Sequence, residues 1–467
     1  MDPPTEQSSR PSSRSALGAV RWLSLCFFLV FSGFNASQFL QATINPDSGA
    51  LNLTILYFFF TCMLIVAPSI VRNLENSSGG LPWVLCLSSI VYSAGAAVNV
   101  FDPQTHPTVT QWLHPISFAA LGIAAALLWT SQAQYLGRCA LKIRSIPLHA
   151  ATSACFSEFF QIYQFAGVAS SAIAAVTSHA GRAWLFGTLA TVAGIGSCLF
   201  LGLPNIKVAH RQATPDNPIA EDLSSRSVLS VSLQAAFASL IPLILATGMM
   251  YGFYIETFST IVKSACSDDS LAGPIAFGSF YLVNSFSTHW WGKVQSGGVN
   301  AGGQKDGIHA GKRALFPGLM VIAFCVGLVV YERSRSAAIS SFALPPLALA
   351  VGASAWFAFA DAFFESQMPA CVQERFQASG AAIAANAGYQ FWLTLGIFLE
   401  FGLQQIAALE VQAAAVCGMT LVGLFIGRKG EGRGDGRVGE GESNSPGSDS
   451  ALREGTALQT VEEGVRV

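Results

Sequence analysis

LPNIKVAHRQATPDNPIAEDLSSRS, residues 203–227, is the longest polar interruption in a chain that otherwise consists mainly of long apolar runs. It contains Pro204, Pro215 and Pro218 and few apolar side chains. Several runs of about 20 apolar residues, the length needed to cross a bilayer as a helix, lie on each side of it. The segment is therefore expected to be a linker outside the membrane that joins two groups of membrane-spanning helices.

The composition indicates a protein of the lipid bilayer. Hydrophobic residues make up 52% of the 467 residues and charged residues only 11%, against roughly 25% charged in an ordinary soluble domain. The formal net charge of -2 gives no indication of nucleic acid or of an acidic substrate as a partner. The ten cysteines are scattered without a CxxC pair, which argues against a disulfide framework and a zinc site. We expect no metal site and no cofactor.

Twelve apolar runs are long enough to span the membrane, six before the linker and six after it. The first run follows Arg10, Arg14 and Arg21, as a signal peptide would, but it is too long for one and is expected to stay as a helix. The fold class is thus an all-α polytopic membrane protein with two six-helix halves. The runs cover about residues 21–42, 52–71, 81–100, 113–135, 151–177, 183–203, 231–255, 271–292, 314–331, 344–369, 380–401 and 407–427.

The basic residues predict which side of the membrane each loop faces, because cytoplasmic loops hold an excess of Lys and Arg. With the N-terminus inside, the inner side holds all 25 basic residues except Arg182, Lys263, Arg333 and Arg335. Both termini are therefore predicted to be cytoplasmic. The tail from residue 428 has almost no apolar residues and is expected to be disordered. The predicted divisions are a tail (1–20), a first half (21–203), a linker (204–230), a second half (231–427) and a tail (428–467).

Six segments between about residues 30 and 405 together resemble one known family, the uncoordinated-ninety-three-like, or ion channel regulatory protein, branch of the major facilitator superfamily. Their order along the chain is more specific than any one of them. They are GFNASQFLQATINPDSGALNLTILYFFF (33–60), APSIVRNLE (67–75), GIAAALLWTSQAQYLGR (122–138), FFQIYQFAGV (159–168), ADAFFESQ (360–367) and NAGYQFWLTLGIF (386–398).

The resemblance implies two halves around a cavity near the middle of the membrane. It also implies an ancillary or regulatory membrane protein, associated with potassium channels and potassium homeostasis or with the trafficking of receptors. Transporters of the superfamily carry a loop like GxxxDRxGRR after their second helix, and this loop helps to lock the inner gate. Here the loop reads VRNLENSSGG, residues 71–80, with one basic residue and no Asp. This departure puts alternating access in doubt.

Asp361 and Glu365, in FADAFFESQMPA (359–370), are two acids inside an apolar run. Each charged residue near a helix centre costs roughly 2.5–3.5 kcal/mol on insertion scales, so the pair is not expected to face lipid. Residues four apart share one helix face. Because no apolar run carries an obvious Lys or Arg to neutralise them, a proton or a metal cation is expected at the pair. The alternative is that Asp361 is a hydrogen-bonded packing residue and that Glu365 extends to water at the interface.

Polar side chains, most of them amides, recur at helical spacing on three further runs. If the first, fourth, seventh and tenth helices line the cavity, as they do in the superfamily, the set on the first run would face Asp361 across it. The other two sets are expected to form hydrogen bonds between helices. The sets are Asn35, Gln38 and Gln41 on the first run, Glu158, Gln161 and Gln164 on the fifth, and Asn386 and Gln390 on the eleventh.

His289 lies at the inner end of the eighth run, next to Trp290 and Trp291. The superfamily arrangement would bring it near Glu158, so the sequence leaves open an interhelical pair or a place in the aromatic belt at the membrane surface.

Two functions remain after the motif search. No HExxH or GxSxG motif is present, and we do not expect an enzyme. The first hypothesis is an ancillary or regulatory partner of an ion channel or a receptor. The alternative is a secondary transporter of a small solute, coupled to a proton or cation through Asp361. The sequence predicts an integral, multi-pass membrane protein, and it does not indicate which membrane.

Overall fold

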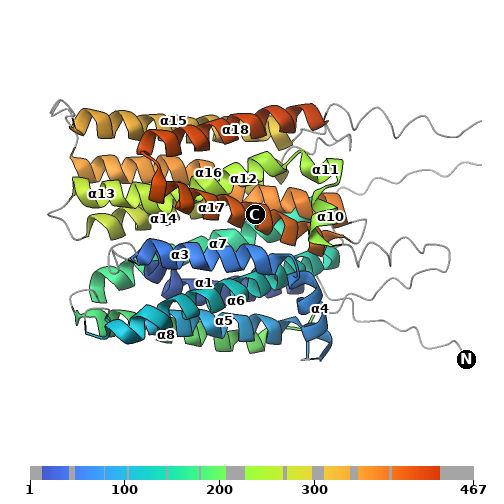
Figure 1. The fold of residues 1–467 in the computed structure, drawn as a ribbon. Helices are drawn as coiled ribbons and strands as arrows, with labels where there is room; N and C mark the ends of the chain where they lie inside the picture. The colour runs from blue at the N-terminus through green and yellow to red at the C-terminus, as the bar shows by residue number, and fades with distance from the viewer. Residues whose placement is uncertain are drawn as a thin grey trace, which may run out of the picture.

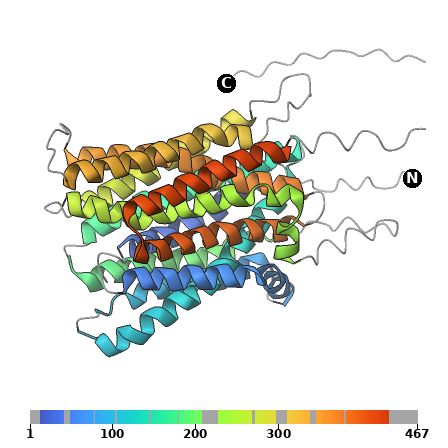
Figure 2. The same ribbon diagram turned by 45° about the horizontal axis from the view of Figure 1, so that its top comes forward.

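The computed structural model describes residues 13–40, 48–77, 79–102, 105–143, 146–177, 180–206, 227–266, 271–296, 310–336, 345–377 and 381–431. Every regular element in these ranges is a helix. The long helices run side by side as one bundle, with α5 and α8 on one flank and α15 and α18 on the opposite flank (Figures 1 and 2). The all-helical fold class expected from the sequence is confirmed.

The first half contains one sharp bend, between α3 and α4. The expected run 52–71 is divided there into two helices whose axes differ by 73°. Pro68 lies in the first turn of α4, where a residue without an N–H is tolerated but cannot continue a preceding helix. The elements are α1 (Ser13–Phe39), α3 (Gly49–Leu64), α4 (Ala67–Ser77), α5 (Leu81–Val98), α6 (Pro107–Lys142), α7 (Leu148–Thr177), α8 (Arg182–Leu199) and η2 (Phe200–Gly202).

The second half begins with a broken helix in place of the continuous run 231–255. Two short helices, the first capped by the hydroxyl of Ser227 on the Ser230 N–H at 3.2 Å, precede Pro242 in the first turn of the next helix. A π-helical turn, η3, follows it. The elements are α10 (Val228–Ser232), α11 (Ala235–Ala238), α12 (Ile241–Gly252), η3 (Phe253–Phe258), α13 (Ser259–Ala265), α14 (Ala272–Ser296), α15 (Ala310–Ser336), α16 (Pro346–Gln377), α17 (Ala382–Ile406) and α18 (Leu409–Glu431).

Ten helical segments in the described ranges are long and apolar enough to cross a membrane, and the bent pair α3–α4 would be an eleventh. The expected eighth span coincides with α14, which is 25 residues long but more polar, and it is not among the ten. The count of twelve spans and the cytoplasmic position of both termini therefore stay predictions.

Glycines allow α12 and α17 to approach each other closely. A Cβ atom on Gly248 would collide with the carbonyl oxygen of Leu393, and one on Gly396 would collide with that of Leu245. Small residues at such crossings let helix backbones touch, which is how helices gain packing energy where lipid replaces water. This close crossing fixes the position of α17, which contributes to both sites described below.

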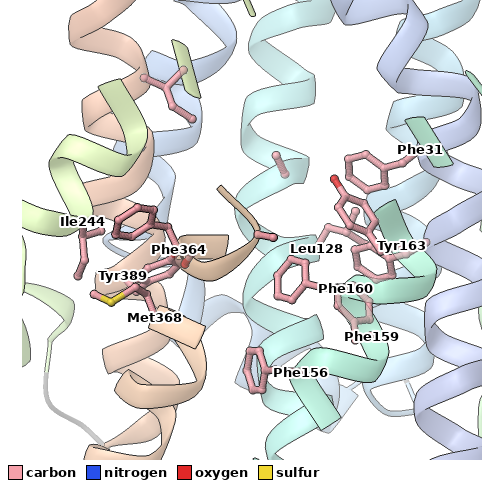
Figure 3. Close-up of a cluster of buried hydrophobic side chains, with 14 of the residues drawn as sticks. Phe31, Leu128, Phe156, Phe159, Phe160, Tyr163, Ile244, Phe364, Met368 and Tyr389 are labelled. Atoms are coloured by element: carbon pink, nitrogen blue, oxygen red, sulfur yellow. Dashed lines mark hydrogen bonds between the residues drawn. The ribbon is translucent and has the colours of Figure 1, made fainter. Parts of the chain in front are cut away.

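The two halves meet through α7 with α14 and through α3 with α17. The Ser285 hydroxyl donates to the carbonyl of Gln161 at 2.6 Å, and the hydroxyls of Thr61 and Thr394 are 2.8 Å apart. Apolar side chains from both halves fill part of the same interface, with Phe156 and Phe160 on one side and Phe364 and Met368 on the other (Figure 3). Polar contacts thus join the halves around an apolar centre.

Candidate functional site

A cavity of about 100 Å³ lies between the two halves. It is lined by residues from α1, α3, α5, α6, α7, α12, α16 and α17. Five of the residues singled out in the sequence line it, namely Asn35, Gln38, Asp361, Glu365 and Gln390. Gln41 lies outside the described residues. The lining is wider than the four helices expected, because α3, α5, α7 and α17 also contribute. Aromatic rings form much of the remaining wall, among them Phe31, Phe34, Tyr57, Tyr92, Trp129, Tyr163, Tyr251 and Tyr389.

Asp361 is held in a chain of hydrogen bonds within the second half. It is 2% exposed, and its Oδ2 accepts from the Nδ2 of Asn284 on α14 at 2.9 Å. The Oδ1 of Asn284 accepts in turn from the Thr288 hydroxyl at 3.1 Å. Thr288 therefore fixes the amide orientation of Asn284, so that the amide presents an N–H to Asp361. An amide donor can hold either the charged or the protonated form of this carboxyl group.

Glu365 lies one turn after Asp361 and reaches across to the other half. Its carboxylate accepts from the side-chain amide of Gln164 on α7, which is 1% exposed. Glu365 is half-buried and lines the cavity, so it does not extend to the membrane surface. The carboxylate pair thus bridges α14, α16 and α7. Because α7 belongs to the first half and the other two helices to the second, the hydrogen bond from Gln164 to Glu365 connects the two halves.

The cavity also contains an amide whose hydrogen-bonding capacity is unused. Gln38 donates to the Tyr57 hydroxyl at 2.8 Å. Asn35 is buried, and its Nδ2 has no hydrogen-bond partner. A buried amide N–H without a partner costs about 1–3 kcal/mol. The group is therefore available to a bound molecule with an acceptor oxygen, opposite a carboxylate pair that suits a cation or a proton. Aromatic faces in the wall add to the attraction for a cation.

The remaining predicted residues lie outside the cavity. Glu158 pairs with Arg21, with 2.7 Å between Nε and Oε1, while His289 is exposed at the bundle surface. Of the two places that the sequence left open for His289, the pairing with Glu158 is not formed, because the side chain of Arg21, within α1, reaches Glu158 instead. Asn386 bonds to Gln373 on α16 and to the carbonyl of Ala382 at 3.0 Å. It connects α16 to α17, which is the structural use considered for these amides.

At the linker end of the bundle, where α4, α10 and α11 lie (Figure 1), hydrogen bonds and an ion pair join elements of the first half. Arg138 of α6 donates to both carboxylate oxygens of Glu75 of α4, at 2.6 and 2.8 Å, and Gln134 adds a third bond at 3.1 Å. The Tyr135 hydroxyl donates to the carbonyl of Pro204 at 2.9 Å. The loop VRNLENSSGG lacks the Asp of transporter members, yet its Glu75 forms a bidentate ion pair in this region.

Comparison with known proteins identifies the family. The model described as "Ion channel regulatory protein UNC-93" matches residues 40–272. The UNC93-like protein MFSD11 of Xenopus laevis is 26% identical over 282 residues, which cover 54% of this chain and 59% of that protein. The putative potassium channel regulatory protein unc-93 of Caenorhabditis elegans is 26% identical over 143 residues, 30% of this chain and 19% of that protein. The chain thus matches less than two thirds of the length of these relatives.

Solved structures agree in fold. The human organic anion transporter MFSD10 superposes with a TM-score of 0.57 at 14% identity, covering 89% of this chain and all of that chain. An auto-inhibited peptide transporter of the POT family gives 0.58 at 12% identity, covering 93% and 99%. The chain is an UNC-93-like protein of the major facilitator type. At these identities the solved structures bear on its fold alone.

Several polar residues of this UNC-93-like chain were missed in the sequence. Asn284 was overlooked because a single Asn in a run with many Ser and Thr side chains resembles packing, although Asn284 and Thr288 are spaced one turn apart. Arg138 was assigned to an inner loop, and its pairing with Glu75 depends on the bend between α3 and α4. Glu256 and Glu400 were also passed over, and both are buried in the second half.

Proposed function

We propose that this UNC-93-like protein is an ancillary, regulatory subunit that assembles with an ion channel in the membrane and acts in potassium homeostasis. The observation that carries the proposal is the family match over residues 40–272, whose model is described as an ion channel regulatory protein. A relative named as a putative potassium channel regulatory protein supports the same class. We propose no enzymatic activity.

The geometry of the cavity supports a regulatory role that responds to cations or protons. Asp361 and Glu365 bond to amides of Asn284 and Gln164, and no Lys or Arg in the described part of the chain pairs with either. The pair connects the halves, so binding of a cation or a proton changes the attraction between α7 and α16. A partner that contacts both halves would sense this change.

A second candidate, a secondary transporter, is favoured by the position of the same pair. Substrate and coupling-ion sites of such transporters lie at the interface between the repeats. The cavity adjoins both halves and presents carboxylates, an unpartnered amide and aromatic faces to a small solute. A cavity of about 100 Å³ fits a cation or a few water molecules in the present conformation.

One pair of experiments separates the two functions. The full chain is co-expressed with candidate potassium channel subunits, and current and co-purification in mild detergent are measured with and without it. We expect a channel subunit to co-purify in a fixed ratio and its current to change. The chain alone is then reconstituted in liposomes, and cation and proton flux are recorded. If the chain alone conducts a flux that Asp361→Asn abolishes, and the channel current does not change, the regulatory proposal is wrong and the protein is a transporter.

A further inference from the structure

A second pair of buried carboxyl groups lies in the C-terminal half, separate from Asp361 and Glu365. Glu256 belongs to the π-helical turn η3, and Glu400 belongs to α17. Their exposed fractions are 4% and 1%, and the two groups interact electrostatically. Neither lines the cavity described above. Buried ionisable groups within a membrane bundle are costly and commonly functional.

The packing of α12 against α17 brings the two groups together. Gly252, one turn before Glu256, lies directly against Glu400, and a Cβ atom on Gly252 would be 3.0 Å from the Cβ of Glu400. Gln404, one turn after Glu400, donates its amide to the two carboxylate oxygens of Glu256, at 2.8 and 2.5 Å, when its amide group is oriented to satisfy both. Glu256 therefore has a donor from α17.

Glu400 has no such donor. Both of its carboxylate oxygens are buried without a hydrogen-bond partner. Neither Glu256 nor Glu400 forms an ion pair with Lys or Arg among the described residues, and Arg333 already pairs with Glu410. Other titratable groups on the elements around the pair include Cys325 on α15, Cys417 on α18, Lys263 on α13, Tyr57 on α3, Tyr251 on α12, Tyr254 on η3, Tyr389 on α17, and Asp361 and Glu365 on α16.

A buried carboxylate without donors and beside a second carboxylate carries a large desolvation cost. A proton removes this cost, because the neutral carboxyl group needs neither a cation nor several donors. A metal ion is less suitable, since no group of three or more His, Cys, Asp or Glu in the described residues could hold one. Gln404 is partly exposed near the end of α17 remote from α10 and α11, and it gives the pair a polar connection toward the bundle surface.

We propose that Glu256 and Glu400 form a second proton-binding site, in which Glu400 holds a proton at neutral pH. The proton removes the repulsion between the carboxylates and allows α12 and α17 to stay in contact at Gly252. Loss of the proton places two negative charges at this contact, one in the π turn and one on α17. π-helical turns within α-helices occur frequently at functional sites. The site thus links proton concentration to the packing of the C-terminal half.

Infrared spectroscopy of the purified full-length protein tests the proposal directly, because a protonated carboxyl group has a carbonyl stretch that a carboxylate lacks. The central pair is first neutralised by Asp361→Asn and Glu365→Gln, so that any remaining signal comes from elsewhere. We expect this background protein to show a protonated-carboxyl band at neutral pH that shifts on deuteration. Adding Glu400→Gln should abolish the band, whereas the control Glu410→Gln should leave it unchanged.

The pH dependence of unfolding gives a second readout. If the folded protein holds a proton that the unfolded chain releases at neutral pH, the folded state binds more protons and its stability falls as pH rises. Glu400→Gln should flatten this fall in the apparent melting temperature, and Glu410→Gln should not. If Glu400→Gln does not fold, the background protein still tests the proposal, because it must show a protonated-carboxyl band at neutral pH. No carboxyl band at neutral pH, or a band that survives Glu400→Gln, would overturn the proposal.

Discussion

The acidic residues inside the two halves of the bundle have different partners. In the N-terminal half, Glu75 and Glu158 pair with Arg138 and Arg21. In the C-terminal half, Glu332 and Glu410 also pair with Arg335 and Arg333, but the acids inside the bundle have no such partner. Asp361, Glu365 and Glu256 bond to amides, and the carboxylate of Glu400 has no donor. The charge of an acid with an Arg beside it is compensated within the protein. An acid inside a membrane bundle without one needs a proton or a ligand. The difference places the candidate binding sites among the interior acids of the second half, which lack an Arg partner.

The same comparison separates an ion pair that lies within one half from a carboxylate pair that connects both halves. The Glu75–Arg138 pair joins the bent helix α4 to α6 at the linker end, within the first half alone. The Asp361–Glu365 pair instead crosses from α16 to α7 and joins the two halves. The proposed proton or cation at this pair would act on the contact between the halves, away from the ion pair at the linker end.

The largest effect is expected from removing one member of the pair in the first half. Arg138→Leu would leave Glu75, whose side chain is 17% exposed, without its bidentate partner. Removing one partner of a buried ion pair costs about 3–5 kcal/mol, and partial exposure favours the lower end. We expect a clear fall in the apparent melting temperature of the purified protein.

The matched control is the double variant Glu75→Leu with Arg138→Leu, which removes both charges and should recover most of the loss. A single Arg138→Leu variant as stable as the wild type would show that charge pairing in the first half contributes little. The ion pairs of the first half could then no longer be contrasted, as stabilising contacts, with the unpaired acids of the second half.

An intermediate effect is expected at Asp361. Asp361→Leu leaves the amide of Asn284 without an acceptor, which costs about 1–3 kcal/mol. Asp361→Asn keeps an acceptor oxygen and should be nearly neutral in thermal stability. It should nevertheless abolish any dependence of Trp129 fluorescence on pH or on added cations, because Trp129 lines the same cavity. An ion-dependent signal that persists in the Asn variant would refute the role of Asp361 in binding and leave it as a packing residue.

The sequence predicted the fold well because the apolar runs and the polar linker reflect the bilayer itself. The resemblance to the superfamily led to the further expectation that Asn35 and Gln38 face Asp361 across a cavity, and these residues line one cavity together with Glu365. What the sequence could not predict depended on helix breaks. The bend before Pro68 allows Glu75 to meet Arg138, and the π turn at residues 253–258 places Glu256 against α17. Neither break follows from hydrophobic periodicity.

The smallest effect is expected at the exposed ion pair of the first half. The side chains of Arg21 and Glu158 are 64% and 26% exposed, although Nε and Oε1 are 2.7 Å apart. Solvent and salt screen such pairs, so Arg21→Gln should change stability by less than about 1 kcal/mol. The difference should shrink further when salt is raised, and thermal unfolding at low and high salt measures it. A loss as large as that of Arg138→Leu would mean that Glu158 depends on Arg21 as strongly as Glu75 depends on Arg138. Pairing with Arg, and not burial, would then determine how strongly Glu75 and Glu158 stabilise the first half.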